Sequence, residues 1–465
     1  MYVSYRKGFL QLLIFIMVAL ILVPAGGGKA VAADVRPISL SGGYAHGLSA
    51  WSDGTVTGWG YNKYGQVGDG TAIDQYVPRK IAGLTDIVQV AAGSSSSFAL
   101  NSAGEVWGWG QNYSLYINND PLLPYQKRSG PTKLEGLQNV ASIITNGYTG
   151  LAIKKDGTVT MWYPSFDQTD NVLMTVRYLP LTGISGIRSA VIAGNDALFL
   201  TDSGGVKQLS IYNSVYGRVR WASDPVSVNS LAASGIKQIA ASGDNAFLLR
   251  TDGQVLRWNR TLKTPSTVAG LGSAYSLQTG YNKLFLVRGN GTLWQWDYNA
   301  GALAKPYQIK DAQSITNVWG STGSFGFAQR KDGTLLGWGA GFYSGLALGS
   351  GTVTNDASIT AVPVQAPLTF TVNGQTVDFY ASSGVINGKI YVPSTSVFKG
   401  LGVKVNMTLS NPDPAQLFIN GKKSGQDITL KYLSNTTLFP LQELCTLLGI
   451  RLDWNPATGE VQLES

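Results

Sequence analysis

The 465-residue sequence contains one cysteine and one histidine, and only 13% of its residues are charged. A single cysteine cannot form an internal disulfide, so the folded chain must be stabilised by packing of its core. One histidine cannot supply the several imidazole ligands of a copper oxidase site. The sequence shows no phosphate-binding loop, metal-ligand cluster or Gly-x-Ser-x-Gly motif. We therefore expect no cofactor, no bound metal and no enzymatic activity.

The first 32 residues have the pattern of a secretory signal peptide. Arg6 and Lys7 precede an apolar run from Phe9 to Val23, which Pro24 ends, and Ala30-Val31-Ala32 offers small residues for cleavage. The alternative is an uncleaved N-terminal anchor, but the run of 15 residues is shorter than the ~20 that a membrane span needs. The pattern predicts a secreted or cell-surface protein with no membrane attachment after cleavage.

The charge balance gives a modest indication of partners. The formal net charge is +8, and removal of the three basic residues of the signal segment leaves +5. Such a surplus is compatible with an anionic wall polymer or an acidic protein, although a scattered surplus is usually only a solvated surface. The sequence contains no dense basic stripe, so we expect no nucleic acid binding.

A short phrase recurs seven times, with a turn-forming residue before glycine, then Val or Leu, and usually Trp. The dipeptides that begin it are Asp53-Gly54, Ala103-Gly104, Asp156-Gly157, Ser203-Gly204, Asp252-Gly253, Asn290-Gly291 and Asp332-Gly333. Their intervals of 50, 53, 47, 49, 38 and 42 residues match one small sheet per repeat. Each dipeptide predicts a hairpin, with a two-residue type I′ turn and positive φ at both central residues.

Three to four strands per repeat, closed radially, are typical of a β-propeller, and seven repeats predict seven blades. The first repeat lacks the Pro-containing strand that precedes the later ones. That strand type reappears at Ala361–Val364. We therefore expect a ring over residues 33–365 whose final blade combines strands from both ends of the ring.

The first repeat unit carries glycine, aromatic and polar residues at fixed spacing, namely Gly43-Tyr44-Ala45-His46, Leu48, Asp53-Gly54, Trp59-Gly60, Asn62, Gly65-Gln66 and Gly68. These residues resemble the repeats of the regulator of chromosome condensation family. The resemblance covers roughly residues 37 to 365 and weakens in the fourth to sixth units. Export is incompatible with nucleotide exchange on a nuclear GTPase, the activity for which the family is known, and a fold does not carry a function with it.

Residues 366–465 have a different pattern. Two Pro-to-Gly segments of similar length, Pro393 to Gly402 and Pro440 to Gly449, each predict a short helix between strands, so we expect a small α+β domain. The phrase Asn387–Pro393 resembles the domain named for the amino-terminal region of copper amine oxidases, a stalk-like module of exported bacterial proteins. Cys445 lies among leucines and is expected to be a buried core thiol.

The polar residues that invite a catalytic interpretation favour structural roles. His46 occupies a repeat position, where an imidazole would satisfy backbone groups between blades. The repeated aspartates are expected to form turns, because no local pattern brings two carboxylates together.

Aromatic residues outside the repeat positions are the candidate partner contacts, because tyrosine is enriched in interfaces and its ring also suits sugars. They are Tyr61, Tyr64, Tyr113, Tyr116, Tyr163, Phe166, Tyr212 and Tyr216.

The fold class predicted is mainly β, a seven-bladed β-propeller followed by a small α+β domain. The function predicted is an exported, non-catalytic binding or scaffold protein that presents propeller loops to a protein partner at the cell envelope. Three alternatives stay open: binding of a wall glycan or anionic polymer, inhibition of an enzyme in the manner of propeller β-lactamase inhibitors, and action on a polysaccharide.

Overall fold

The structure of the chain is a computed structural model. It describes residues 35–111, 130–147, 149–166, 174–215, 218–221, 228–300, 304–339, 347–350, 358–377, 383–386, 388–392, 398, 401–403, 405–408, 416–420, 422–423, 428, 431–433, 436–456 and 458–465. The predicted signal peptide, residues 1–32, lies outside the described residues. No helix of the described part is long and apolar enough to cross a membrane.

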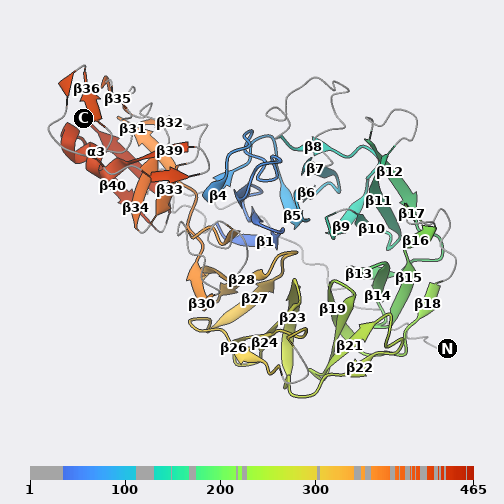
Figure 1. Cartoon of the computed structure of the whole chain (residues 1–465). Helices are drawn as coiled ribbons and strands as arrows, with labels where there is room; N and C mark the ends of the chain where they lie inside the picture. The colour runs from blue at the N-terminus through green and yellow to red at the C-terminus, as the bar shows by residue number, and fades with distance from the viewer. Residues whose placement is uncertain are drawn as a thin grey trace, which may run out of the picture. The chain divides into compact units, whose positions relative to one another are not determined.

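Seven four-stranded antiparallel sheets follow one another between residues 37 and 363 of the described chain (Figure 1). The first contains β1 (Pro37–Gly42), β2 (His46–Trp51), β3 (Val56–Gly60) and β4 (Gln75–Lys80). The second and third contain β5 (Ile87–Ala92), β6 (Ser96–Asn101), β7 (Val106–Gly110) and β8 (Thr132–Lys133), then β9 (Val140–Thr145), β10 (Gly150–Lys154), β11 (Val159–Phe166) and β12 (Met174–Pro180).

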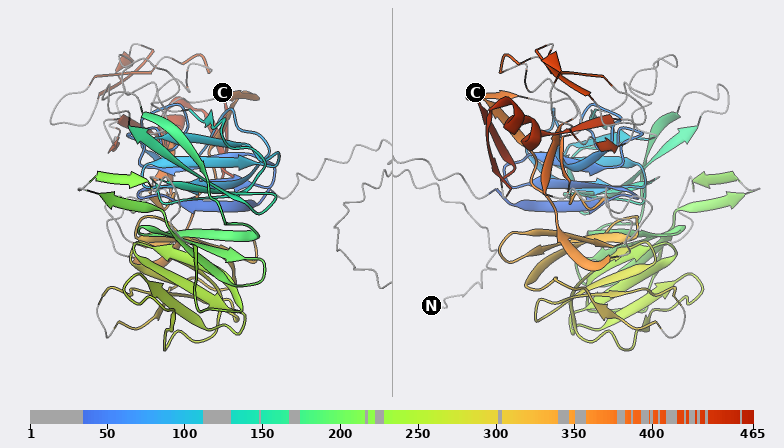
Figure 2. Two further views of the ribbon diagram at one scale, coloured as in Figure 1. Left: turned by 90° about the vertical axis from the view of Figure 1, so that its right-hand side faces the viewer. Right: turned by 60° about the vertical axis from the view of Figure 1, so that its left-hand side comes forward.

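The fourth sheet contains β13 (Ile187–Ala193), β14 (Asp196–Thr201), β15 (Val206–Ser210) and β18 (Val228–Ser230). Between its last two strands, β16 (Tyr212–Val215) and β17 (Arg218–Trp221) pair only with each other, and Figure 2 shows this hairpin extending away from the sheet. The fifth to seventh sheets are β19 (Ile236–Ser242), β20 (Asn245–Arg250), β21 (Val255–Asn259), β22 (Ser266–Thr267); β23 (Ala274–Gly280), β24 (Lys283–Arg288), β25 (Leu293–Trp296), β26 (Tyr307–Gln308); and β27 (Ile315–Trp319), β28 (Phe325–Arg330), β29 (Leu335–Gly339), β30 (Ser358–Pro363).

Antiparallel pairing places the connections of every sheet at one of two ends. We call the end with the turns between first and second strands, and with the connections between third and fourth strands, the loop end. The opposite end, with the Gly-containing hairpin turns and the connections to the next sheet, is the turn end. The connection from β3 to β4 at the loop end, residues 61–74, is longer than the connection from β4 to β5 at the turn end, residues 81–86.

The first strands of successive sheets contact one another, and β27 and β28 also contact β1. Gly42 of β1 forms a parallel bridge with Ser321, and its N–H donates to the carbonyl of Gly320 at 3.0 Å. The expectation of a final blade built from both ends of the ring is wrong, since each sheet is one continuous stretch of chain. The Pro-containing strand at residues 361–363 does form, as part of β30, but it pairs with β29 of its own sheet.

The apolar core of this region lies between neighbouring sheets. Aromatic rings from adjacent sheets meet edge to face, with centroids 5.4 Å apart for Phe98 and Trp162 and 5.0 Å apart for Phe285 and Trp338. Trp59 of the first sheet and Phe327 of the last meet in the same way at 5.5 Å. Edge-to-face pairs of buried aromatics add to the free energy gained from their burial. In these sheets the repeated Trp is therefore the residue that packs against the neighbouring sheet.

The hairpin turns differ from the predicted type I′ turns. In all seven the glycine has positive φ, as in Gly54 with φ of 79°, whereas Asp53 and its six counterparts do not. The N–H of Gly54 donates to the carbonyl of Trp51, and the N–H of Trp51 donates to the carbonyl of Thr55. This is a three-residue loop, a type I turn closed by a glycine bulge. The position of each hairpin was predicted correctly, but its turn type was wrong.

The remainder of the described chain forms further sheets and a helix. The sheets are β32 (Gln375–Val377), β31 (Thr369–Val372), β41 (Glu460–Glu464), β40 (Arg451–Asn455); β33 (Gly384–Ile386), β34 (Lys389–Val392), β39 (Thr436–Pro440), β38 (Lys431–Leu433); and β35 (Val405–Thr408), β36 (Gln416–Ile419), β37 (Lys422–Lys423).

The helix is α3 (Leu441–Leu448), which follows Pro440 and ends at Gly449 in the left-handed conformation, so the second predicted helix is confirmed. Most of the first predicted helix, at Pro393 to Gly402, lies outside the described residues. Cys445 is buried as expected, and burial raises the pKa of its thiol to about 12. Its sulfur packs into the same apolar cluster as Val77 of β4 and the strands around α3.

Two equivalent hairpin turns allow two contributions to a loss of stability to be measured separately, namely the cost of a positive φ and the cost of a steric contact. A Cβ at Gly54 would lie 2.9 Å from the backbone of Asp86, whereas a Cβ at Gly333, in the same turn of the seventh sheet, would meet nothing within 4 Å. We expect Gly333→Ala to cost about 1 kcal/mol of stability through its positive φ alone. Gly54→Ala should lower the melting temperature further. Equal losses for the two variants in thermal unfolding would show that the contact with Asp86 is unimportant.

Candidate binding face around the central channel

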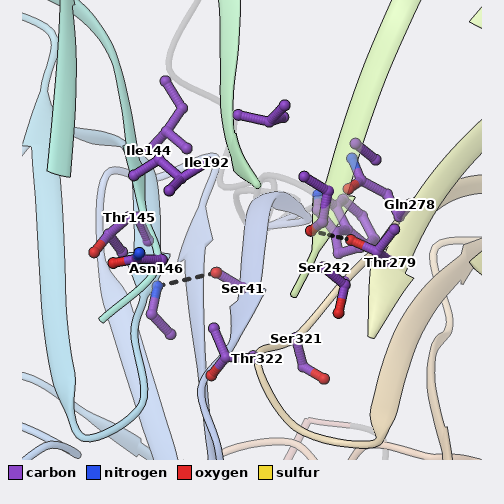
Figure 3. A pocket seen from close by; sticks show the side chains of 18 of the residues that line it. Ser41, Ile144, Thr145, Asn146, Ile192, Ser242, Gln278, Thr279, Ser321 and Thr322 are labelled. Atoms are coloured by element: carbon purple, nitrogen blue, oxygen red, sulfur yellow. Dashed lines mark hydrogen bonds between the residues drawn. The ribbon is translucent and has the colours of Figure 1, made fainter. Parts of the chain in front are cut away.

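The first strands of all seven sheets and the turns that follow them surround a cavity of about 810 Å³ (Figure 3). We call this cavity the channel. Among the described residues, its lining consists of glycine and of aliphatic, hydroxyl, amide and aromatic residues, and contains no Asp, Glu, Lys, Arg or His. A lining without charged groups offers no acid or base for proton transfer at neutral pH. The channel can therefore hold water or an uncharged polar group, but it presents no catalytic pair.

Several polar side chains of the first strands bind the backbone of the neighbouring sheet. The Gln89 amide donates from Nε2 to the carbonyl of Ile143 at 2.9 Å and accepts from the N–H of Ile143 at 2.9 Å. Gln238 forms the same pair with Leu277, at 2.8 and 3.1 Å. Ser41 Oγ accepts from the N–H of Ala92 at 3.0 Å, as the dashed line in Figure 3 shows. These side chains take the place of backbone pairing between the first strands.

Two channel side chains remain able to bind a ligand, and a third has a hydroxyl without a partner. Within the described part of the chain, Gln278 and Ser242 have no side-chain hydrogen bond, and Thr322 Oγ1 has no partner although it is shielded from solvent. Figure 3 shows all three beside the cavity. Their amide and hydroxyl groups suit neutral hydrogen-bonding groups such as sugar hydroxyls or backbone amides.

His46 is buried between the first and second sheets rather than exposed in a catalytic position. Its Nε2 lies 2.9 Å from Ser97 Oγ, and that hydroxyl donates to the carbonyl of Gln66 at 2.6 Å. Because the Ser97 hydroxyl donates its proton to Gln66, it can only accept from His46. His46 Nε2 therefore carries the proton, and Nδ1 of the neutral ring is unprotonated. Burial lowers the pKa of His46 to about 3. The imidazole is a neutral structural link between sheets, as predicted, but its partner is the Ser97 hydroxyl and not the predicted backbone groups.

The repeated aspartates form turns, as expected. Asp156 Oδ1 accepts from the N–H of Thr158 at 2.9 Å and from its hydroxyl at 2.7 Å. The hydroxyl and then the N–H of Thr158 hold the pKa of the Asp156 carboxyl below its usual range. The corresponding carboxylates belong to turns of different sheets. Among the described residues, no group of three or more His, Cys, Asp and Glu side chains is placed to hold a metal ion.

The candidate contact residues fall mainly at the loop end. Tyr61 and Tyr64 are half-buried there, with ring centroids 6.4 Å apart, and Tyr163 is half-buried near the end of β11. For Phe166 and Tyr212 only the backbone is described, in β11 and β16. Tyr113, Tyr116 and Tyr216 lie outside the described residues. The proposed role of all eight in binding stays a prediction.

The structure adds two aromatic residues that the sequence interpretation missed. Tyr44 and Tyr281 are 55% and 57% exposed, and both line the channel at the loop end. Tyr44 follows Gly43, the residue directly after β1, and Tyr281 follows Gly280, the last residue of β23. The residue after this glycine differs among the repeats, and in the second sheet it is Ser94. Alignment of the repeats at this position would therefore have shown that the two tyrosines are not part of the repeat pattern. Together with Tyr61 and Tyr64, they make the loop end the candidate binding face.

Comparison with known proteins agrees with the repeat pattern. Two family models described as "Regulator of chromosome condensation (RCC1) repeat" match residues 53–100 and 87–114. The chain is 44% identical over 261 residues to the RCC1 domain-containing protein RUG3, mitochondrial, of Arabidopsis thaliana, which covers 51% of this chain and 56% of the relative. It is 39% identical over 74 residues to the ultraviolet-B receptor UVR8 of the same plant, covering 16% of this chain and 17% of the receptor.

Among solved structures, the crystal structure of human WBSCR16 resembles this chain with a TM-score of 0.52 and 16% identity, over 70% of this chain and 96% of that one. Likeness at such identity concerns the fold alone. The chain therefore carries chromosome-condensation-regulator-type repeats in a mainly β, propeller-like fold. The matches span only about half of RUG3 and about a sixth of UVR8.

The contribution of the Gln89 hydrogen bonds to stability can be measured with Gln278, a second glutamine of the channel, as the control. Gln89→Leu leaves the N–H and carbonyl of Ile143 without partners, so we expect a loss of about 2–4 kcal/mol in the free energy of unfolding. Gln278→Leu removes no hydrogen bond within the described part and should change stability by less than about 1 kcal/mol. Urea unfolding followed by tryptophan fluorescence measures both. Similar losses would contradict the linking role of Gln89.

The buried histidine predicts a dependence of stability on pH. The unfolded chain binds a proton at His46 below about pH 6.5, whereas the folded chain does so only near pH 3. Stability from this residue is therefore complete above pH 6.5 and is lost as the pH falls toward 3. At pH 5 the loss should be about 2 kcal/mol.

The variant His46→Gln keeps an N–H for Ser97 and cannot be protonated. Thermal unfolding at pH 7.5 and pH 5 should therefore show a smaller decrease for the variant than for the native protein. The same decrease in both proteins would show that His46 does not cause the pH dependence.

Proposed function

We propose that the chain is an exported, non-catalytic scaffold protein that binds another protein through the loop end of a closed, seven-bladed β-propeller. The observation that carries this proposal is the pair of exposed tyrosines, Tyr44 and Tyr281, at the opening of the channel. Tyrosine supplies a large contact area at a low cost in conformational entropy, and it is enriched in interfaces. Both tyrosines lie in short turns between hydrogen-bonded strands. The backbone of these turns is therefore already ordered, and binding of a partner costs little conformational entropy.

Contacts between the first and last sheets support the closed ring. The Trp59–Phe327 pair and the hydrogen bonds of Gly42 occur between strands that are far apart in sequence. Radial closure leaves only short, protected sheet edges, which favours a rigid and monomeric support for loops. Residues 366–465 are proposed to be a small α+β stalk domain of the type found at the amino terminus of copper amine oxidases, without a copper site.

The proposed location, outside the cell or at the cell envelope, depends on the signal-like pattern of residues 1–32. Wall polymers and secreted enzymes are the partners available there. A more specific form of the same proposal is that the chain inhibits a secreted enzyme, as propeller inhibitors of β-lactamases do. The curated relatives include a receptor and a mitochondrial protein, so the repeats by themselves do not specify the partner.

Binding of a neutral glycan is the second candidate. The uncharged lining of the channel favours it, because sugars bind through hydroxyl and amide groups beside aromatic rings. Gln278, Ser242 and Tyr281 would supply such groups at one side of the opening. This candidate predicts binding of neutral oligosaccharides that is insensitive to salt.

Two tyrosines of one strand provide a matched test. Tyr281 follows the loop end of β23, and Tyr275 lies near its turn end with a similar exposure of 62%. The native protein should retain a specific protein from a cell-envelope extract in a salt-resistant complex. We expect Tyr281→Ala to weaken that complex about tenfold in surface plasmon resonance, whereas Tyr275→Ala should leave it unchanged.

The opposite order of effects would move the binding face to the turn end. Retention of wall glycan alone, lost in Tyr281→Ala, would replace the protein partner by a sugar. Equal binding by both variants would contradict the role of these tyrosines.

A further inference from the structure

A bulge recurs at the start of the first strand in all seven sheets. In β1, Pro37 pairs with Trp51 and Ser39 pairs with Ala50, so Ile38 is left over. The same register shift occurs in each of the other sheets. The residue left over is exposed in six sheets and half-buried in the fifth, whereas the residue before it is always buried. The seven bulge residues, which we call the turn-end ring, are Ile38, Val88, Ala141, Arg188, Lys237, Tyr275 and Thr316.

Five of the seven residues of the turn-end ring form two chemically different arcs. Ile38, Val88 and Ala141 come from three consecutive sheets, and the first two are exposed by 43% and 42%. The next two sheets contribute Arg188 and Lys237. Because the first strands of successive sheets contact one another, the three apolar residues form one arc and the two cations form the next. Such a grouping differs from singly scattered apolar residues, which need no explanation.

The two cations are positioned but not neutralised. Arg188 donates from Nη2 to the carbonyl of Ile236 at 2.8 Å, which holds its guanidinium beside the fifth sheet. Lys237 Nζ lies 5.3 Å from the centroid of the Tyr275 ring. Neither has an ion-pair partner among the residues that the structure describes. By contrast, Arg250, on the hairpin of the fifth sheet, pairs with Asp252 at 3.3 Å.

We propose that the turn-end ring is a second binding surface, which takes an acidic peptide segment of a partner protein that also carries apolar side chains. The carboxylates of the segment would pair with Arg188 and Lys237, and its apolar side chains would cover Ile38 and Val88. Complementary charge fixes the register of such a contact, and burial of the apolar arc contributes affinity. The surface is separate from the loop end, so the inference does not depend on the proposed function.

The hairpin turns favour a narrow partner over a flat one. Asp53, Asp156, Asp252 and Asp332 are exposed at the same end, on turns between the second and third strands. These strands lie outward of the first strands that carry the ring, so the carboxylates surround it. An anionic membrane would contact these carboxylates together with the ring and be repelled. A single peptide segment contacts the ring alone.

Selection from a phage-displayed library of random dodecapeptides on the full chain tests the proposal. The double variant Arg188→Ala/Lys237→Ala serves for counterselection. We expect the enriched peptides to combine acidic and apolar residues. In fluorescence anisotropy their Kd should rise about tenfold for the double variant, rise at high salt, and also rise for Val88→Ser.

Two control variants separate the ring from its surroundings. Lys154→Ala/Lys155→Ala removes the same charge from a neighbouring hairpin of the turn end and should leave the Kd unchanged. Tyr281→Ala alters the loop end and should also have no effect, so failure here is distinguishable from failure of the proposed function. Circular dichroism and melting temperature check that each variant is folded.

Any of the following outcomes would overturn the proposal. One is an absence of peptides that prefer the native chain to the double variant. Another is enrichment of peptides without acidic residues, or equal loss of affinity in the lysine control pair. The third is flotation with vesicles of phosphatidylcholine and phosphatidylglycerol that requires Arg188 and Lys237, without peptide binding, which would identify a lipid surface as the partner.

Discussion

The hydrogen bonds that join the first strands of neighbouring sheets are the constraint on which the rest of the structure depends. Twisted sheets arranged around an axis diverge from one another, so their first strands cannot form continuous backbone ladders. The side-chain amides of Gln89 and Gln238 replace the missing backbone hydrogen bonds. Each amide donates to the carbonyl and accepts from the N–H of one residue in the next sheet. Because these amides are bound to the neighbouring sheet, they are not available to a partner, and we place recognition of a protein at the two ends.

The two ends are suited to different tasks because their connections differ. The loop end carries the longer connections and the exposed Tyr44 and Tyr281, and the turn end carries tight hairpins around a ring of bulge residues. Neither end, within the described part of the chain, brings together a base, an acid and a nucleophile. His46 is neutral and buried, and Asp156 is bound to its own turn. This distribution of chemistry, with exposed groups at the two ends, is compatible with the binding role proposed above.

The sequence predicts local features of this fold better than features that depend on several strands. Asp53-Gly54 and its counterparts locate the hairpins, and Pro440 and Gly449 locate α3, because local backbone preferences decide both. The turn type was missed, since only the strand register shows that the glycine alone adopts positive φ. The turn-end ring was missed for the same reason, because a bulge exists only relative to its partner strand. Exposure of Tyr281 likewise depends on the neighbouring sheet.

Hydrogen–deuterium exchange of the full chain, alone and bound to the protein captured from the cell envelope, tests the central claim most directly. The account predicts slower exchange in the complex at the turns of Tyr44 and Tyr281 and at residues 61–74, and unchanged exchange around Ile38 and Val88. Because these segments fall in different peptides, the two ends can be distinguished in one measurement. Protection confined to the turn end, or to residues 366–465, would contradict the claim that the loop end of the propeller is the binding face.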